Sequence, residues 1–163
     1  MKPFHFALQP KSLVYPVRMM IAAILALIAA KVLGLPEAYW APIITLIVLQ
    51  TNFTASLTVS GQQLAGTALG SILGALLAMH FGPSAIAFAL GVLGVGLLSV
   101  ALKLGRQASR IGATALCIVL LIVRTEPPWI VALHRFLEVS VGIVVALIVS
   151  AAWPETESVP IPH

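Results

Sequence analysis

The chain has 163 residues, of which 60% are hydrophobic and 9% are charged, and its mean hydropathy is +1.09. A soluble domain of this size cannot bury so much apolar surface, whereas lipid hydrocarbon is a good solvent for it. The formal net charge of +4 comes from nine Lys and Arg residues that lie between or at the ends of apolar runs. Composition therefore predicts an all-α integral membrane protein inserted in a lipid bilayer, with no nucleic-acid partner.

Six apolar runs are bounded by Pro, Gly or charged residues, and each predicts a transmembrane helix: 17–34, 39–50, 61–80, 84–102, 109–123 and 131–153. The second and fifth runs are short for a span of about 20 residues, so we expect these helices to be tilted, broken or shielded in the bundle. Residues 1–16, interrupted by Pro10 and Pro16, are expected to form a lead, 17–153 the transmembrane domain and 154–163 a tail. The first run is interpreted as a retained helix rather than a signal peptide, because further spans follow it.

The basic residues are distributed unequally between the two expected faces of the membrane. Three lie on one face, Lys31, Arg124 and Arg135, and six lie on the face of the N-terminus, namely Lys2, Lys11, Arg18, Lys103, Arg106 and Arg110. Cytoplasmic loops are enriched in Lys and Arg. This distribution predicts cytoplasmic N- and C-termini, and we expect the protein in a bacterial inner membrane.

Three helices in each half would place the second half upside down relative to the first, so an inverted repeat is expected. The segment Gly66-Thr67-Ala68-Leu69-Gly70 with Gly74 can be laid over Glu138-Val139-Ser140-Val141-Gly142 with Ala146, with small residues at every fourth position. Small residues at this spacing are also ordinary in packed membrane helices. In either case Gly66, Thr67, Gly70, Gly74 and Gly142 are predicted helix-packing positions.

Catalytic chemistry is not supported by the residues available. Five acidic residues and four scattered histidines form no Ser-His-Asp set, no metal-ligand cluster, no paired carboxylates and no phosphate-binding loop. The single cysteine, Cys117, excludes an intramolecular disulfide and a zinc cluster. We expect no enzyme activity, no cofactor and no metal.

Arg135 and Glu138 are the strongest candidate site residues, because their spacing places both on one face of the last helix. A guanidinium donates two parallel hydrogen bonds to a carboxylate, so a substrate-facing Arg135 predicts an anionic substrate. The alternative is an interfacial ion pair that anchors the helix end. His134 could couple proton movement, or it could be an interfacial polar residue.

Several further polar or aromatic residues lie at the ends of the apolar runs. Tyr39 and Trp40 begin the second run and could either stack on a planar substrate or belong to the interfacial aromatic belt. Thr45 and Gln50 follow in the same run. Gln50, Asn52, Gln62 and Gln63 could line a vestibule, or belong to a solvated connection with helix caps in the gap from Thr51 to Ser60. Lys31 and Arg110 could be ligands or snorkelling anchors.

Three segments, in order, resemble the transmembrane module of the fusaric acid resistance, or aromatic acid exporter, superfamily. They are Tyr39-Trp40-Ala41-Pro42-Ile43-Ile44-Thr45 running to Gln50, Gln63-Leu64-Ala65-Gly66-Thr67-Ala68-Leu69-Gly70, and Arg135-Phe136-Leu137-Glu138 with Gly142 and Ala146. The resemblance implies passage of small organic anions, typically aromatic carboxylates, through a bundle built from two six-helix modules. It would give Arg135, Glu138, Tyr39, Trp40, Thr45, Gln50, Gln63 and Arg110 a part in substrate binding.

The chain departs from this superfamily in two respects. It carries one six-helix module and no soluble domain, so a functional unit would require a homodimer or a higher homo-oligomer. It has Gln63 where relatives often carry Arg before the Gly-Thr pair, which shifts the expected cationic role to Arg135, Arg110 and Lys31. Two other functions remain open: a non-transporting subunit that assembles with a partner protein, and a cation or multidrug exporter that uses Glu138.

Overall fold

The computed structural model describes residues 10–50, 52–122 and 125–153 of the chain. This part folds as six helices without a strand, which confirms the all-α prediction. The helices are α1 (Pro10–Val32), α2 (Trp40–Val48), α3 (Phe53–Phe81), α4 (Ala85–Ala101), α5 (Gly105–Leu121) and α6 (Pro128–Ala152). Residues 1–9 of the predicted lead 1–16, the tail 154–163 and Arg124 lie outside the described residues. Residues 10–16, also predicted as lead, belong to α1.

Four helices begin earlier than their apolar runs indicated: α1 by seven residues, α3 by eight, α5 by four and α6 by three. The expected gap from Thr51 to Ser60 was wrong, because α3 starts at Phe53, where the side chain of Asn52 accepts a hydrogen bond from the Ala55 amide at 2.8 Å. Its first turns are rich in Ser and Thr, and Thr58 donates to the carbonyl of Thr54. Such hydroxyls are accommodated in a helix by bonding the preceding turn. Helix α1 likewise starts at Pro10, where a missing amide costs least, and it includes Pro16 in its second turn.

Helices α1 (from Leu13), α3 and α6 are long and apolar enough to cross a membrane. Helix α4 is apolar but has only 17 residues. Helices α2, with 9 residues, and α5, with 17, are short. The described chain is therefore a multi-pass membrane protein in which three long helices are accompanied by three shorter ones.

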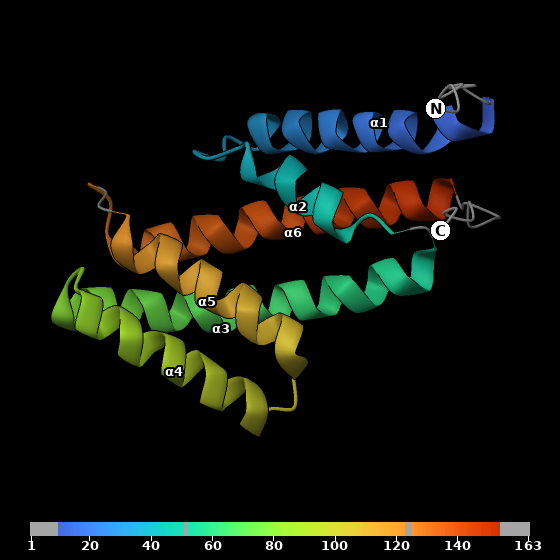
Figure 1. Cartoon of the computed structure of the whole chain (residues 1–163). Coiled ribbons are helices and arrows are strands. Elements are labelled where there is room, and N and C mark those ends of the chain that lie inside the picture. Colours follow the sequence, from blue (N-terminus) through green and yellow to red (C-terminus); the bar gives the residue numbers. More distant parts are fainter. Residues whose placement is uncertain (1–9, 51, 123–124, 154–163) are drawn as a thin grey trace, which may run out of the picture.

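Helices α3 and α6 form the central pair of the bundle, and each is covered by the short helix of the other half of the chain (Figure 1). Helix α5 packs on α3, and α2 packs on α6. The outer helices complete the arrangement, because α4 packs on α5 and α3 whereas α1 packs on α2 and α6. The start of α1 and the end of α6 lie at the same end of the bundle.

Glycines allow the two close helix approaches of this arrangement. A β-carbon on Gly70 would overlap the backbone carbonyl of Gly112 in α5, and one on Gly66 would overlap the carbonyl of Ala108. On the other side, a β-carbon on Gly142 in α6 would lie 2.5 Å from the carbonyl oxygen of Ala41 in α2. Backbones can meet this closely only where side chains are absent.

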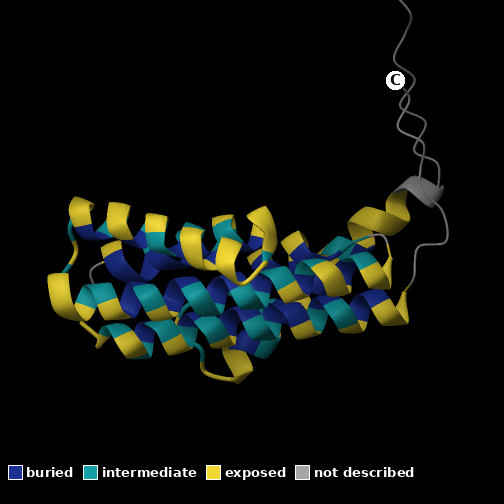
Figure 2. Cartoon of the chain, turned by 90° about the horizontal axis from the view of Figure 1, so that it is seen from below, coloured by how far each residue is buried: buried dark blue, intermediate teal, exposed yellow. Residues whose placement is uncertain are grey.

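Buried residues face the helix contacts and exposed apolar residues face outward, as a lipid environment requires (Figure 2). Helix α1 contacts its neighbours through Ala22, Ala26 and Ala30, each with 0% of its surface exposed. Two apolar clusters fill the interior. One joins α2 to α6 through Ile44, Val48, Val139, Ile143 and Ala146, and the other joins α4 to α5 through Ala87, Val95, Leu116 and Leu120.

Candidate functional site

Arg135 and Glu138 are both buried in α6, with 5% and 1% of their surface exposed. They lie one helical turn apart, and Nη1 of Arg135 is 3.9 Å from Oε2 of Glu138. Ionised side chains inside a transmembrane helix are costly, and they usually face a bundle interior or a pathway. The pair lies in the N-terminal half of α6, which begins at the end of the bundle opposite to the start of α1.

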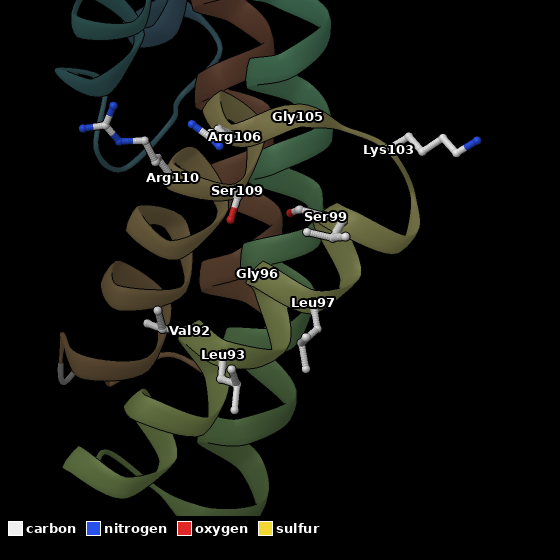
Figure 3. A pocket seen from close by; sticks show the side chains of 11 residues that line it. Val92, Leu93, Gly96, Leu97, Ser99, Lys103, Gly105, Arg106, Ser109 and Arg110 are labelled. Carbon is white, nitrogen blue, oxygen red and sulfur yellow. The ribbon is translucent and has the colours of Figure 1, made fainter.

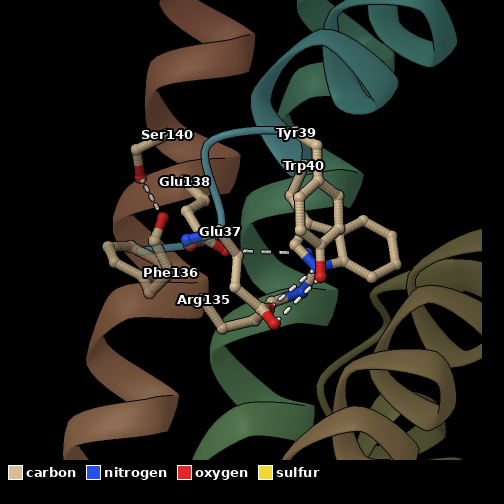
Figure 4. Close-up of polar contacts among 7 residues, drawn as sticks. All are labelled: Glu37, Tyr39, Trp40, Arg135, Phe136, Glu138 and Ser140. Carbon is tan, nitrogen blue, oxygen red and sulfur yellow. Dashed lines mark hydrogen bonds and ion pairs between the residues drawn. The ribbon is translucent and has the colours of Figure 1, made fainter. Parts of the chain in front are cut away.

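Trp40, at the start of α2, covers the guanidinium of Arg135 (Figure 4). The Cζ atom of Arg135 lies 3.7 Å from the centroid of the Trp40 ring, which is a close cation–π contact. The ring of Tyr39 adjoins that of Trp40, with centroids 5.6 Å apart. Tyr39 is exposed and Trp40 is half-buried. The aromatic pair therefore connects the buried cation to the surface of the protein.

Glu37 links the aromatic residues to the buried pair, and sequence reasoning missed it. Its carboxylate accepts hydrogen bonds from the Tyr39 hydroxyl at 2.9 Å and from Nε1 of Trp40 at 3.0 Å. Its backbone amide donates to Oε1 of Glu138 at 3.0 Å. A signal was present, because Glu37 is one of only five acidic residues and stands two positions before the aromatic pair. We call Glu37, Tyr39, Trp40, Arg135 and Glu138 the α2–α6 polar cluster.

A second polar group lies at the end of the bundle where α1 starts, and it centres on Arg18, whose exposed fraction is 0%. Nη2 of Arg18 donates to the backbone carbonyl of Gln50 at 2.9 Å and to Oγ of Ser150 at 3.2 Å. Ser56 bonds the same Ser150 hydroxyl at 3.0 Å and accepts from the Gln50 amide. The sequence suggested only a basic lead residue, but Arg18 ties α1 to α6 and to the α2–α3 connection.

The remaining predicted site residues do not join the α2–α6 polar cluster. The hydroxyl of Thr45 donates to the carbonyls of Ala41 and Gly142, both at 2.9 Å, and so fastens α2 to α6. Gln50 lies with Arg18. Arg110 lies on α5, exposed, beside a groove that α5 forms with α4. These three residues therefore lie in three separate places outside the cluster.

Gln63 lies on the buried face of α3, with 4% of its surface exposed, and its Oε1 has no hydrogen-bond partner. The hydroxyls of Ser60 and Ser71 on the same face also lack one. Buried polar atoms are usually paired. The buried face of α3 therefore carries three polar atoms that could form hydrogen bonds inside the bundle.

His134 lies apart from Arg135, with Nδ1 at 3.5 Å from Oε2 of Glu126. Among the described residues no group of three His, Cys, Asp or Glu side chains is placed to hold a metal ion. Cys117 is a half-buried free thiol.

A helical membrane protein with a buried, aromatic-capped arginine in a transmembrane helix is the class that the fold and the site define. The chain belongs to the fusaric acid resistance protein-like family, whose family model matches residues 23–149 and confirms the resemblance seen in the sequence. No curated protein and no solved structure matches the chain.

Proposed function

We propose that the protein moves small organic anions, of the aromatic carboxylate class, across the membrane as a homo-oligomer. The observation that carries the proposal is the burial of Arg135 against Trp40 inside α6. A guanidinium recognises a carboxylate through two parallel donors, and an adjoining indole face suits a planar ring. Membership of the fusaric acid resistance protein-like family supports an efflux role.

We also propose that the six helices all cross the membrane and form a 3+3 inverted repeat. The packing supports it, because exchanging the halves maps α1 onto α4, α2 onto α5 and α3 onto α6, and turns the α2–α6 contact into the α5–α3 contact. It likewise turns the α1–α6 contact into the α4–α3 contact. The offset that aligns Gly70 with Gly142 aligns Gln63 with Arg135. The unpartnered Gln63 therefore stands at the position equivalent to the proposed substrate cation.

The centre of a single chain is filled by packed side chains, including Val48, Val139 and Ala146, each with 0% of its surface exposed. A pathway through one copy would need these helices to separate. We therefore place the pathway between copies, with the α2–α6 polar cluster facing it through Tyr39 and Trp40.

The test is uptake of radiolabelled benzoate by proteoliposomes that contain the purified protein. Arg135→Gln should lower the initial rate at least tenfold, because it removes the carboxylate-binding fork. Arg135→Lys keeps the charge but not the two parallel donors, so its initial rate should lie between those of wild type and Arg135→Gln. Arg110→Gln is the matched control, since Arg110 is outside the cluster. Equal flux with Arg135→Gln would remove Arg135 from the mechanism, and absence of flux in wild type together with a co-purifying chain would favour a non-transporting subunit.

A cation or multidrug exporter is the second candidate, and one observation favours it. Two carboxylates, those of Glu37 and Glu138, belong to the same cluster as the single guanidinium of Arg135. The ionised cluster would carry one excess negative charge and two aromatic rings, which suits an organic cation. If the protein exports cations, Glu138→Gln should abolish flux of tetraphenylphosphonium and leave benzoate flux unchanged. The anion function predicts instead that the substitution lowers benzoate flux and leaves tetraphenylphosphonium flux unchanged.

A further inference from the structure

A groove of about 850 Å³ lies between α4 and α5, and none of the residues that line it belongs to the α2–α6 polar cluster. Its lower part is apolar and is lined by Val92, Leu93, Gly96 and Leu97 of α4 (Figure 3). Leu93, Leu97 and Val100 are exposed by 59%, 63% and 78%. Because α4 is an outer helix of a membrane bundle, this groove opens toward lipid.

Three basic residues line the other end of the groove: Lys103 in the α4–α5 turn, and Arg106 and Arg110 in the first turns of α5. Figure 3 shows Lys103 on one side of this end and the two arginines on the other. All three are exposed. Among the residues that the structure describes, no acidic side chain lines the groove. The groove therefore joins a cluster of positive charge to a strip of apolar surface, which is the complement of a molecule with an anionic head and an apolar chain.

The turn that carries Lys103 holds it in an uncommon conformation. The amide of Leu104 bonds the carbonyl of Ser99, and the amide of Lys103 bonds that of Val100, which closes α4 in a Schellman motif. Lys103 has φ 54°, in the left-handed region where glycine is the usual residue. A lysine is thus held at the groove mouth at a cost in backbone strain.

Two hydroxyls lie between the cationic and the apolar parts of the groove. Ser99 has 2% of its surface exposed, and its Oγ has no hydrogen-bond partner. Figure 3 shows the hydroxyls of Ser99 and Ser109 facing each other across the gap between α4 and α5. A buried donor without a partner is expected to bond something that enters the groove.

We propose that the α4–α5 groove binds one anionic phospholipid. The phosphate would lie among Lys103, Arg106 and Arg110, the Ser99 hydroxyl would donate to an ester oxygen, and an acyl chain would lie along Leu93 and Leu97. Along the bundle, the α4–α5 turn lies beside Gln62 of α3 rather than beside the start of α3, because a β-carbon on Gly105 would lie 3.9 Å from Nε2 of Gln62. A lipid head at this depth is accommodated by local thinning of the bilayer and by the length of the basic side chains.

The experiment is native mass spectrometry of the purified full chain with phosphatidylglycerol or phosphatidylcholine added in matched amounts. Wild type should retain phosphatidylglycerol at least tenfold more strongly, since each basic residue near an anionic lipid favours binding several-fold. Arg106→Gln with Arg110→Gln should remove this preference. Glycerol phosphate, which has the charge but no chain, should not compete at millimolar concentration.

Two further variants test the groove without threatening the fold. A β-carbon on Gly96 meets no atom within 4 Å, so Gly96→Leu should fill the groove and lower phosphatidylglycerol retention about tenfold. Gly61→Leu, at an equally open glycine on α3 outside the groove, is the matched control. Lys103→Gly should weaken retention while relieving the turn. Two results would overturn the proposal: equal retention of both lipids by wild type, or unchanged phosphatidylglycerol retention in Gly96→Leu. A change of oligomeric state in Gly96→Leu, with no loss of lipid, would also overturn it, because a second copy would then cover the groove.

Discussion

The guanidinium of Arg135 lies beneath the indole ring of Trp40, with Cζ 3.7 Å from the ring centroid, and joins α6 to the start of α2. The same indole donates its N–H to Glu37, whose backbone amide bonds Glu138. One aromatic residue therefore orients both the cation and the carboxylates of the site. Trp40 therefore contributes both to the stability of the protein and to the proposed anion site, and variants of Trp40 can distinguish the two contributions.

Trp40→Phe keeps an aromatic face over Arg135 but loses the hydrogen bond to Glu37, whereas Trp40→Leu loses both. We expect Trp40→Phe to destabilise the protein by about 1 kcal/mol and Trp40→Leu by about 2 kcal/mol or more. Thermal unfolding in a fixed detergent measures the difference. Equal losses for the two variants would show that the cation–π contact contributes nothing to stability. Benzoate flux is expected to follow the same order.

Gly70 is where the backbones of α3 and α5 come closest, because a β-carbon there would overlap the carbonyl of Gly112. Gly70→Ala should therefore separate the two helices and destabilise the protein by about 1 to 3 kcal/mol. Gly61→Ala adds the same methyl group where nothing lies within 4 Å and should be neutral or slightly stabilising. The comparison is made by thermal unfolding, and indistinguishable midpoints would contradict the observed packing.

Arg18→Met should detach α1 from the bundle. The substitution keeps a long buried side chain but removes the donor to the Gln50 carbonyl, and it leaves the Ser150 hydroxyl with its bond to Ser56. The expected loss is about 1 to 3 kcal/mol, with faster proteolysis of α1 as an independent readout. Ser150→Ala, which removes one acceptor only, is the milder comparison. A stability unchanged in Arg18→Met would mean that this end of the bundle is held by apolar contacts alone.

The proposed orientation can be read with single cysteines, since Cys117 is the only native one. In a Cys117→Ala background, a cysteine at Gly34 or Glu126 should react with an impermeant maleimide added outside intact cells. A cysteine at Leu102 or Asn52 should react only after the membrane is opened. This pattern requires α2 and α5 to cross the membrane, and it agrees with the proposed cytoplasmic termini. Labelling of the cysteine at position 102 from outside would mean that α4 and α5 have the opposite orientation to the one proposed.

Composition and apolar periodicity were enough to predict a helical membrane protein, because the insertion of apolar side chains in lipid depends on local sequence rather than on tertiary contacts. The family was also visible in short segments around Tyr39, Gly66 and Arg135, which the family model confirms. The order and type of six helices followed from the same runs. Helix starts were less accurate, because capping by Asn52 overrides the polarity of the residues that follow.

Tertiary structure alone decided which polar residues meet. Arg135 and Arg110 are both basic residues of the second half, yet one is buried against Trp40 and the other borders an open groove. Glu37 and Arg18 gained their roles through contacts with residues far away in the chain. Spacing fixes which residues share a helix face, but the rotation and depth of each helix depend on the glycine contacts between helices, and these set which faces come together.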